Sequence, residues 1–384
     1  MNAGMSIPPE PENDGRLSAD DSMSQEKLYL ASQWRLMWWK FVDHRLALCS
    51  MYLLCLFYFV ALFCGFFAPH NPSQRARDLS FAPPQRVHLV HEGRLRGPFV
   101  YPRIQHFDQE LALLTYTEDR SRVQPIRFFV RGDTYRFWGL VETSVHLVGL
   151  RDGGRLYLMG ADRLGRDLFS RILYGSRISL SIGLVGVFLS LVLGIVIGGI
   201  SGYFGGVTDT VIQRFIEILM SIPSIPLWMA LAAAVPPTWS QLTVYFCMTT
   251  ILALIGWTGV AREVRGKILA LREEDYAMAA RAAGVKEFRI LMRHLVPGFT
   301  SHLIVVVTLA IPAMILAETA LSFLQLGLRA PTISWGVLLQ DAMNLQAVNL
   351  YPWLIWPTAF VVFVVLLFNF LGDGLRDAAD PYRH

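Results

Sequence analysis

This 384-residue chain is poor in cysteine and in charged residues, and it lacks a nucleotide-binding motif. Its four cysteines all lie within apolar runs, so its polar segments have no thiol for a disulfide framework or a cysteine-based metal site. The Gly266-Lys267 pair is followed by Ile268 rather than Ser or Thr, which excludes a Walker A motif there. We therefore expect no catalytic residue, no metal site and no bound cofactor in this chain.

What the chain has in abundance is apolar sequence. Hydrophobic residues make up 53% of it and its mean hydropathy is +0.41, which is typical of a polytopic membrane protein. Six runs come near the roughly 20 residues that a bilayer requires. They are about 46–67, 178–200, 211–235, 242–261, 299–324 and 352–372. The first begins too deep in the chain for a cleavable signal peptide, so we expect it to stay in the membrane.

Charge between the spans predicts their orientation. Residues 262–293 carry eight Lys or Arg against five acids, whereas 327–351 carry one of each. By the positive-inside rule the first loop is cytoplasmic and the second lies outside, which puts both termini inside. The long loop 68–177 is rich in Arg, but loops of this length are translocated regardless of charge. On the inside, Gly205-Gly206 predicts a tight turn, after which Thr208 or Asp209 can cap the next helix.

The segments around the first span differ in composition. Residues 1–45 precede the first span: 1–28 read as a polar cytoplasmic tail, and 29–45, rich in tryptophan, predict either an interfacial helix or the cytoplasmic start of the first span. Residues 68–177 contain alternating runs such as 126–130 and 135–140, with a turn at Gly153-Gly154, and predict a small β-rich subdomain outside the membrane. That subdomain either contacts another protein or braces the outer mouth. Residues 178–384 would form the core, with a cytoplasmic loop at 262–298.

Within that loop, residues 273–297 predict a short helix, a glycine break and a second helix. Acids stand at the first turn, where the helix dipole favours them, and Gly284 is the usual residue for a left-handed helix end. Pro297 interrupts the second helix. One face carries small residues with a tyrosine, a surface that another protein can approach closely. The residues that define this segment are Glu274, Asp275, Tyr276, Ala279, Ala280, Ala283, Gly284 and Pro297.

This segment resembles the coupling loop of binding-protein-dependent ABC importer permeases, in which Glu-Ala-Ala is followed at fixed spacing by Gly and Leu-Pro. Ala279, Ala280, Gly284 and Pro297 fall in register, whereas Met278, His294 and Val296 depart from the pattern. The resemblance implies that this helix contacts a separate ATPase.

A second signature precedes the second span. Leu168, Phe169, Ile172 and Leu173 make an apolar stripe, which predicts a helix lying on the outer membrane surface. The run resembles the signature of the second permease subunit in peptide and nickel importers, and residues 371–382 also resemble this branch. The matching residues include Gly160, Asp162, Gly165, Arg166, Asp167, Ser170, Arg171, Gly175, Arg177 and Ser179.

Three residues within the spans are candidates for the translocation path. Pro223 and Pro226 must free backbone carbonyls at membrane depth, which are tolerated only inside protein or beside water. Simple bundle packing explains them at least as well. Glu318 is costly in hydrocarbon and must face the bundle, where we favour structural hydrogen bonding over solute contact.

The resemblance implies an all-α polytopic protein with the six-helix type I ABC importer permease fold and a β-rich periplasmic insertion. It would be a multi-pass protein of the bacterial inner membrane that moves peptides, or alternatively oligosaccharides or nickel. Its implied partners are a second homologous permease, two ABC ATPases that use ATP and Mg, a periplasmic solute-binding protein and membrane lipid, but no nucleic acid. A self-sufficient secondary carrier is a different hypothesis, but the sequence shows no internal repeat to support it.

Overall fold

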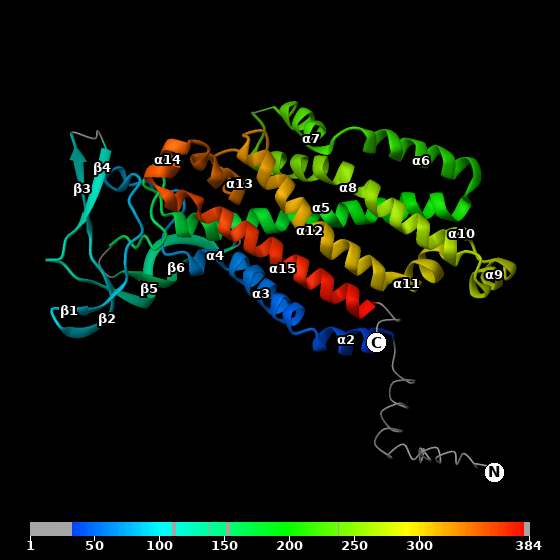
Figure 1. The fold of residues 1–384 in the computed structure, drawn as a ribbon, viewed down its shortest axis with the longest axis horizontal. Coiled ribbons are helices and arrows are strands. Elements are labelled where there is room, and N and C mark those ends of the chain that lie inside the picture. The colour runs from blue at the N-terminus through cyan, green and yellow to red at the C-terminus, as the bar shows by residue number, and fades with distance from the viewer. Residues whose placement is uncertain (1–32, 110–112, 138, 151–153, 237, 380–384) are drawn as a thin grey trace, which may run out of the picture.

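The computed structural model describes residues 33–109, 113–137, 139–150, 154–236 and 238–379. The expected tail at 1–28, Gly153 of the expected turn and residues 380–382 of the carboxy-terminal run lie outside them. The described part is a bundle of long helices with two small sheets at one end, called here the sheet end (Figure 1). The opposite end, called the loop end, carries α9 (Figure 1).

Five described helices are long and apolar enough to cross a membrane, or six if one bent pair counts as a single span. The five candidate spans are α3 Arg45–Leu62, α5 Leu168–Phe204, α8 Gln241–Leu271, α12 Thr300–Phe323 and Pro352–Ala379, which joins η5 Pro352–Ile355 to α15 Trp356–Ala379. The bent pair is α6 Gly206–Ser221 and α7 Ser224–Ala233.

Shorter helices connect or flank these spans. At the sheet end they are α4 Cys64–Phe67, η1 Arg77–Leu79, α13 Trp335–Leu338, η4 Leu339–Met343 and α14 Leu345–Leu350. At the loop end they are α2 Gln33–Asp43, α9 Asp275–Ala282, α10 Glu287–Ile290, the π-helix η3 Leu291–Leu295 and α11 Val296–Gly298.

The third expected span is strongly bent. α6 and α7 meet at 83°, and the break falls at Ile222 and Pro223. Pro223 is the N-cap of α7 and Pro226 lies in its first turn, where a missing N–H leaves no helical hydrogen bond unmade. The two prolines therefore start a new helix rather than kink an existing one.

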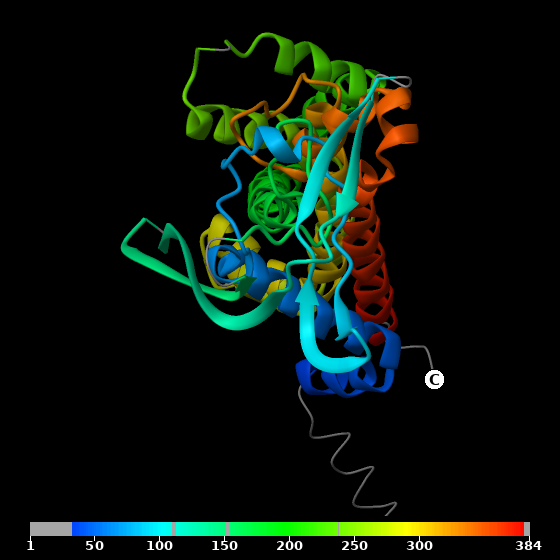
Figure 2. The same cartoon turned by 90° about the vertical axis from the view of Figure 1, so that its left-hand side faces the viewer.

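α5 is a single helix of 37 residues, so residues 168–177 are its first turns rather than a separate surface helix. The difference has a packing cause, because Leu168 and Ile172 are buried in the bundle core instead of facing lipid. Figure 2, viewed from the sheet end, shows α5 end-on near the centre of the bundle.

A row of small residues on α5 allows α8 to approach closely. Ser190, Gly194, Gly198 and Gly202 recur every four residues, and each of them lies against α8. A Cβ atom at Gly198 would collide with the carbonyl oxygen of Ala261, and one at Gly202 would lie 2.9 Å from that of Arg265. Small residues at such spacing bring helix backbones together in membranes.

The insertion between α4 and α5 contains two antiparallel sheets. One has the order β1-β2-β5-β6 and the other pairs β3 with β4. The strands are β1 His88–His91, β2 Arg94–Val100, β3 Arg103–Asp108, β4 Leu113–Glu118, β5 Gln124–Phe137 and β6 Val141–Leu150. The expected runs 126–130 and 135–140 fall largely in β5, which pairs with β6 from Ile126 opposite Leu150 to Phe137 opposite Val141.

A matched pair of glycine substitutions tests the α5–α8 contact. Gly198→Ala places a methyl group against the α8 backbone and should lower the apparent Tm of the purified protein in detergent. Gly259→Ala on α8 has open space around the new Cβ and should leave Tm unchanged or raise it, because alanine favours a helix by roughly 1 kcal/mol. Equal Tm changes in the two variants would contradict the close packing.

Candidate functional site

The carboxylate of Asp162 organises the loop before α5. It is buried, and its Oδ1 accepts hydrogen bonds from the backbone N–H groups of Leu164 at 2.8 Å and Arg166 at 3.0 Å. Its Oδ2 accepts from Arg166 Nε at 2.6 Å and lies 3.4 Å from Arg171 Nε. A buried charge is tolerated when it is paired and hydrogen-bonded in this way.

Asp167 caps the start of α5. Its carboxylate accepts from the backbone N–H groups of Phe169 at 3.3 Å and Ser170 at 2.9 Å, and from Ser170 Oγ at 2.5 Å. Ser170 Oγ in turn accepts from the N–H of His70 at 3.1 Å, which ties the cap to the chain leaving α4. Complete burial raises the pKa of Asp167 to about 7, because lost hydration outweighs these donors.

Two glycines of the outer signature fit where no side chain would. Gly160 and Gly165 have φ of +81° and +70°, in the left-handed region that glycine tolerates. A Cβ at Gly165 would overlap the carbonyl of Ala76, and one at Gly160 would lie 2.9 Å from that of Ala82. The signature loop is therefore packed against the segment that precedes the sheets.

Glu318 is the centre of a second buried cluster, at 1% exposure. Its Oε1 accepts from Ser322 Oγ and Ser334 Oγ, both at 2.8 Å, and its Oε2 accepts from Ser179 Oγ at 3.2 Å. These serines belong to α12, the N-cap of α13 and α5. One carboxylate thus joins α12 and the start of α13 to α5, which lies far away in the sequence.

Each of the three hydroxyls also accepts a backbone N–H. Ser179 Oγ accepts from Trp335 at 3.1 Å, Ser322 Oγ from Leu328 at 3.0 Å and Ser334 Oγ from Val337 at 3.2 Å. With the oxygen lone pairs engaged by N–H groups, each hydroxyl proton is directed to Glu318. Glu318 and these three serines, called here the Glu318 hub, therefore form a structural hydrogen-bond network. Among the described contacts, none leaves the carboxylate open for a solute.

The remaining outer-signature residues have different surroundings. Gly175 packs against Trp335, where an added Cβ would lie 3.3 Å from the ring. Arg177 is exposed on α5, two positions before the buried Ser179. The signature therefore divides into buried packing residues and one exposed cation.

At the loop end, α9 matches the expected short helix. Glu274 is its N-cap, Asp275 lies in its first turn, and Gly284 follows it with φ of +75°. Tyr276, Ala279 and Ala283 are exposed, and Pro297 lies in α11.

The inward face of α9 differs from the expected small-residue face. Ala277 is buried in a cluster with Ile290, Leu291 and Leu295, and Ala280 packs against the same cluster. Ala280 therefore helps to hold α9 on the bundle, while Ala279 and Ala283 face outward.

An ion pair that the sequence did not reveal lies at the loop end of α5. The sequence predicts Thr208 or Asp209 as the cap of α6, which is wrong, because Gly205 occupies that position. The carboxylate of Asp209 instead accepts hydrogen bonds from Arg265 of α8, from Nε at 2.5 Å and from Nη2 at 2.6 Å. It also accepts one from Ser201 Oγ at 2.5 Å. A bidentate pair of this kind fixes the mutual orientation of its helices.

Comparison with known proteins assigns the chain to a family. The family described as the binding-protein-dependent transport system inner membrane component matches residues 194–383, and the N-terminal TM domain of oligopeptide transport permease C matches residues 32–84. The oligopeptide transport system permease protein OppC of Bacillus subtilis is 40% identical over 58% of this chain and 70% of its own length. The chain belongs to the family of binding-protein-dependent transport permeases. The predicted family is thereby confirmed.

Other relatives agree with this assignment. OppC of Haemophilus influenzae is 40% identical over 64% of this chain and 74% of its own, and the dipeptide permease DppC of B. subtilis is 39% identical over 58% and 68%. A chain of the inward-facing MetNI methionine ABC transporter matches in structure over 55% of this chain and 97% of its own, at 18% identity and a TM-score of 0.42. The permease is a multi-pass membrane component of an ABC transporter, and the expected helical fold with a β-rich insertion after the first span is confirmed.

The Glu318 hub makes a stability prediction. Glu318→Ala removes the shared acceptor and leaves buried serine hydroxyls unpaired, which should cost about 3 kcal/mol and lower the apparent Tm in detergent. Glu318→Gln keeps a carbonyl oxygen and should have a smaller effect. Glu217→Ala is a matched control, because Glu217 is exposed and pairs with the exposed Arg214. Equal Tm values for Glu318→Ala and Glu217→Ala would refute the hub.

Proposed function

We propose that this chain is one of two homologous permease subunits of a peptide importer in a bacterial inner membrane. Two separate ABC ATPases would hydrolyse ATP with Mg, and a periplasmic binding protein would deliver the solute. The relatives described above support peptides as the substrate class, since their names specify oligopeptides and dipeptides. A further relative, GsiD of Pectobacterium atrosepticum, is named for glutathione, itself a short peptide.

The observation that carries the proposal is the placement of α9. It lies at the far end of the bundle from the sheets (Figure 1), and its outward surface is formed by Tyr276, Met278, Ala279 and Ala283. Phe288 is exposed beside it. An exposed aromatic and small-residue surface on a short helix fits docking into a groove of another protein.

The sequence charge supports the proposed orientation. The loop that contains α9 has a larger excess of Lys and Arg than the short loop 327–351, which favours the cytoplasmic side for α9, where ATP is available. The sheets would then be periplasmic, and both termini cytoplasmic. We place the domain boundaries at residues 45, 67 and 177, between the cytoplasmic tail, the first span, the periplasmic insertion and the core.

A mechanical connection runs from α9 into the spans. Ala277 and Leu291 share a buried cluster with Val264 of α8 and Leu303 of α12. Arg272, after α8, donates to the carbonyl oxygens of Gly202 at 3.1 Å and Tyr203 at 3.3 Å at the end of α5. In the proposed mechanism, closure of the ATPases displaces α9 and these contacts carry the movement into α5, α8 and α12.

A bulky substitution on the outward face of α9 tests the docking. Ala283→Trp should abolish co-purification of the ATPase subunits and uptake of labelled peptide, because the side chain would block close approach. Ala233→Trp, at an exposed alanine on α7, controls for added surface bulk and should keep the ATPases bound. Unchanged co-purification of the Ala283→Trp variant would disprove α9 as the docking element. If the unmodified chain co-purifies with the ATPases but the complex takes up no peptide, only the proposed substrate class is disproved.

A further inference from the structure

The hairpin formed by β5 and β6 exposes large apolar side chains near the membrane. Phe128 and Phe129 are 63% and 68% exposed, and Leu140 and Val141, at the turn, are 84% and 62% exposed. The first pair lies on β5 opposite Val148 and the second pair at the hairpin turn, and together they are called here the exposed patch of the hairpin; large apolar side chains exposed in this way are unusual for contact with water alone. The patch belongs to neither the signature loop nor the α9 surface.

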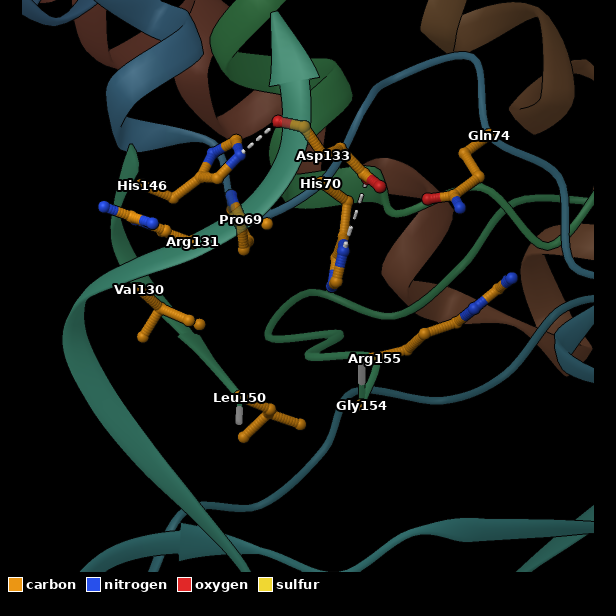
Figure 3. A pocket seen from close by; sticks show the side chains of 12 residues that line it. Pro69, His70, Gln74, Val130, Arg131, Asp133, His146, Leu150, Gly154 and Arg155 are labelled. Atoms are coloured by element: carbon orange, nitrogen blue, oxygen red, sulfur yellow. Dashed lines mark hydrogen bonds and ion pairs between the residues drawn. The ribbon is translucent and has the colours of Figure 1, made fainter. Parts of the chain in front are cut away.

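The hairpin is fixed to the end of the first span. The ring of Tyr135 packs directly on Gly65, where an added Cβ would overlap it, and Tyr135 OH donates to the carbonyl oxygen of Val145 at 2.9 Å. The two nitrogens of the buried His146 ring face the carbonyl oxygens of Ala68 at 2.5 Å and Asp133 at 2.8 Å (Figure 3). These contacts fix the position of the hairpin relative to α4.

A cavity of about 330 Å³ lies beside this attachment and is lined by His70, Asp133, Arg131 and Arg155 (Figure 3). Burial lowers the pKa of His70 to about 4, and its Nε2 accepts the N–H of Leu156 at 2.9 Å. His70 is therefore neutral near pH 7 and serves as a packing group. The carboxylate of Asp133 accepts the N–H of Asn71 at 2.9 Å.

The patch is continuous with the apolar surface of the span. Phe59, half-exposed on α3, lies 4.7 Å from Phe63 between ring centroids, and Phe63 lies 5.3 Å from Phe137 of β5. Phe66 of α4 contacts Phe129 at 6.1 Å. Seen from the sheet end, the hairpin reaches sideways past the helices (Figure 2), whereas β1 and β2 lie farther from them along the bundle axis (Figure 1). The surface that meets lipid along α3 thus extends onto the hairpin.

Exposed arginines alternate with the aromatic residues. Arg127 and Arg131 flank Phe128 and Phe129, and Arg136 precedes Phe137. Arg136 Nε lies 3.9 Å from Glu142, and both of those side chains are exposed. Aromatic rings and guanidinium groups together suit the headgroup layer, where rings lie among glycerol groups and cations meet phosphates.

We propose that the β5–β6 hairpin rests in the headgroup layer of the membrane and binds the phosphates of anionic lipids through Arg127 and Arg136. The hairpin then anchors the insertion to the bilayer beside the first span. This inference depends on the membrane location of the permease and is independent of the transported solute.

Photo-crosslinking of the complete transporter in bilayers tests the proposal. Benzoylphenylalanine replaces Leu140, and the adducts are identified by mass spectrometry in bilayers that contain phosphatidylglycerol and phosphatidylcholine. Leu140 should give lipid adducts. Leu95 is a matched negative control, because it is 80% exposed on the β1–β2 hairpin and should give none. Tyr52, exposed on α3, calibrates the yield of lipid adducts.

Each outcome bears on the proposal. Protein adducts at Leu140 would show that another subunit covers the hairpin, and a yield as low as at Leu95 would show that it faces water; either result would overturn the inference. The fraction of phosphatidylglycerol among the adducts should exceed its fraction in the bilayer. That enrichment should vanish when Arg127→Gln and Arg136→Gln are combined, and an unchanged enrichment would remove the phosphate assignment.

Discussion

The close approach of α8 to α5 is the constraint on which the rest of the bundle depends. Inside a bilayer, helices gain little from hiding apolar side chains, so van der Waals contact and satisfied polar groups must hold them together. The row of glycines from Gly194 to Gly202 provides that contact, and Ser190 Oγ adds a hydrogen bond to the carbonyl oxygen of Ala253 at 3.2 Å. A side chain on this face would separate the two backbones.

Both ends of α5 carry the polar clusters that fix its neighbours. At the sheet end, Asp167 caps the helix and Ser179 reaches Glu318, which brings in α12 and α13. At the loop end, the Asp209–Arg265 pair and the bonds from Arg272 hold α6 and α8. Because the helix between these clusters is continuous, a displacement at one end is transmitted as a movement of the whole helix. This suits the coupling proposed for the permease.

Local sequence patterns predicted much of the fold. Apolar runs located the spans, alternating residues located β5, and Gly284 was recognised as a left-handed helix end, which its φ of +75° shows it to be. These features depend on residues that are close together in the chain, so a short stretch of sequence carries the whole signal. The repeat of small residues on α5 is a signal of the same kind, because a spacing of four marks one helix face.

Other features depend on contacts between distant segments. The carboxylate of Glu318 could be expected to face inward, but Ser179 and Ser334 lie 139 and 16 residues away in sequence, and nothing local identifies them as its partners. Arg265 lies 56 residues from Asp209, so capping of α6 was the simpler local expectation. The 83° bend between α6 and α7 depends on packing that a pair of prolines permits but does not specify.

The exposed face of α5 combines a cation with large apolar side chains. Arg177, Leu184 and Phe188 lie on one side of the helix and are all exposed. A guanidinium group facing the centre of a bilayer costs roughly 2.5–3.5 kcal/mol, whereas one near water or another protein costs far less. The leucine and phenylalanine on the same face disfavour a purely aqueous boundary. A surface that combines a cation with large apolar groups is best satisfied by a second helical subunit, as the proposed pairing of two permeases requires.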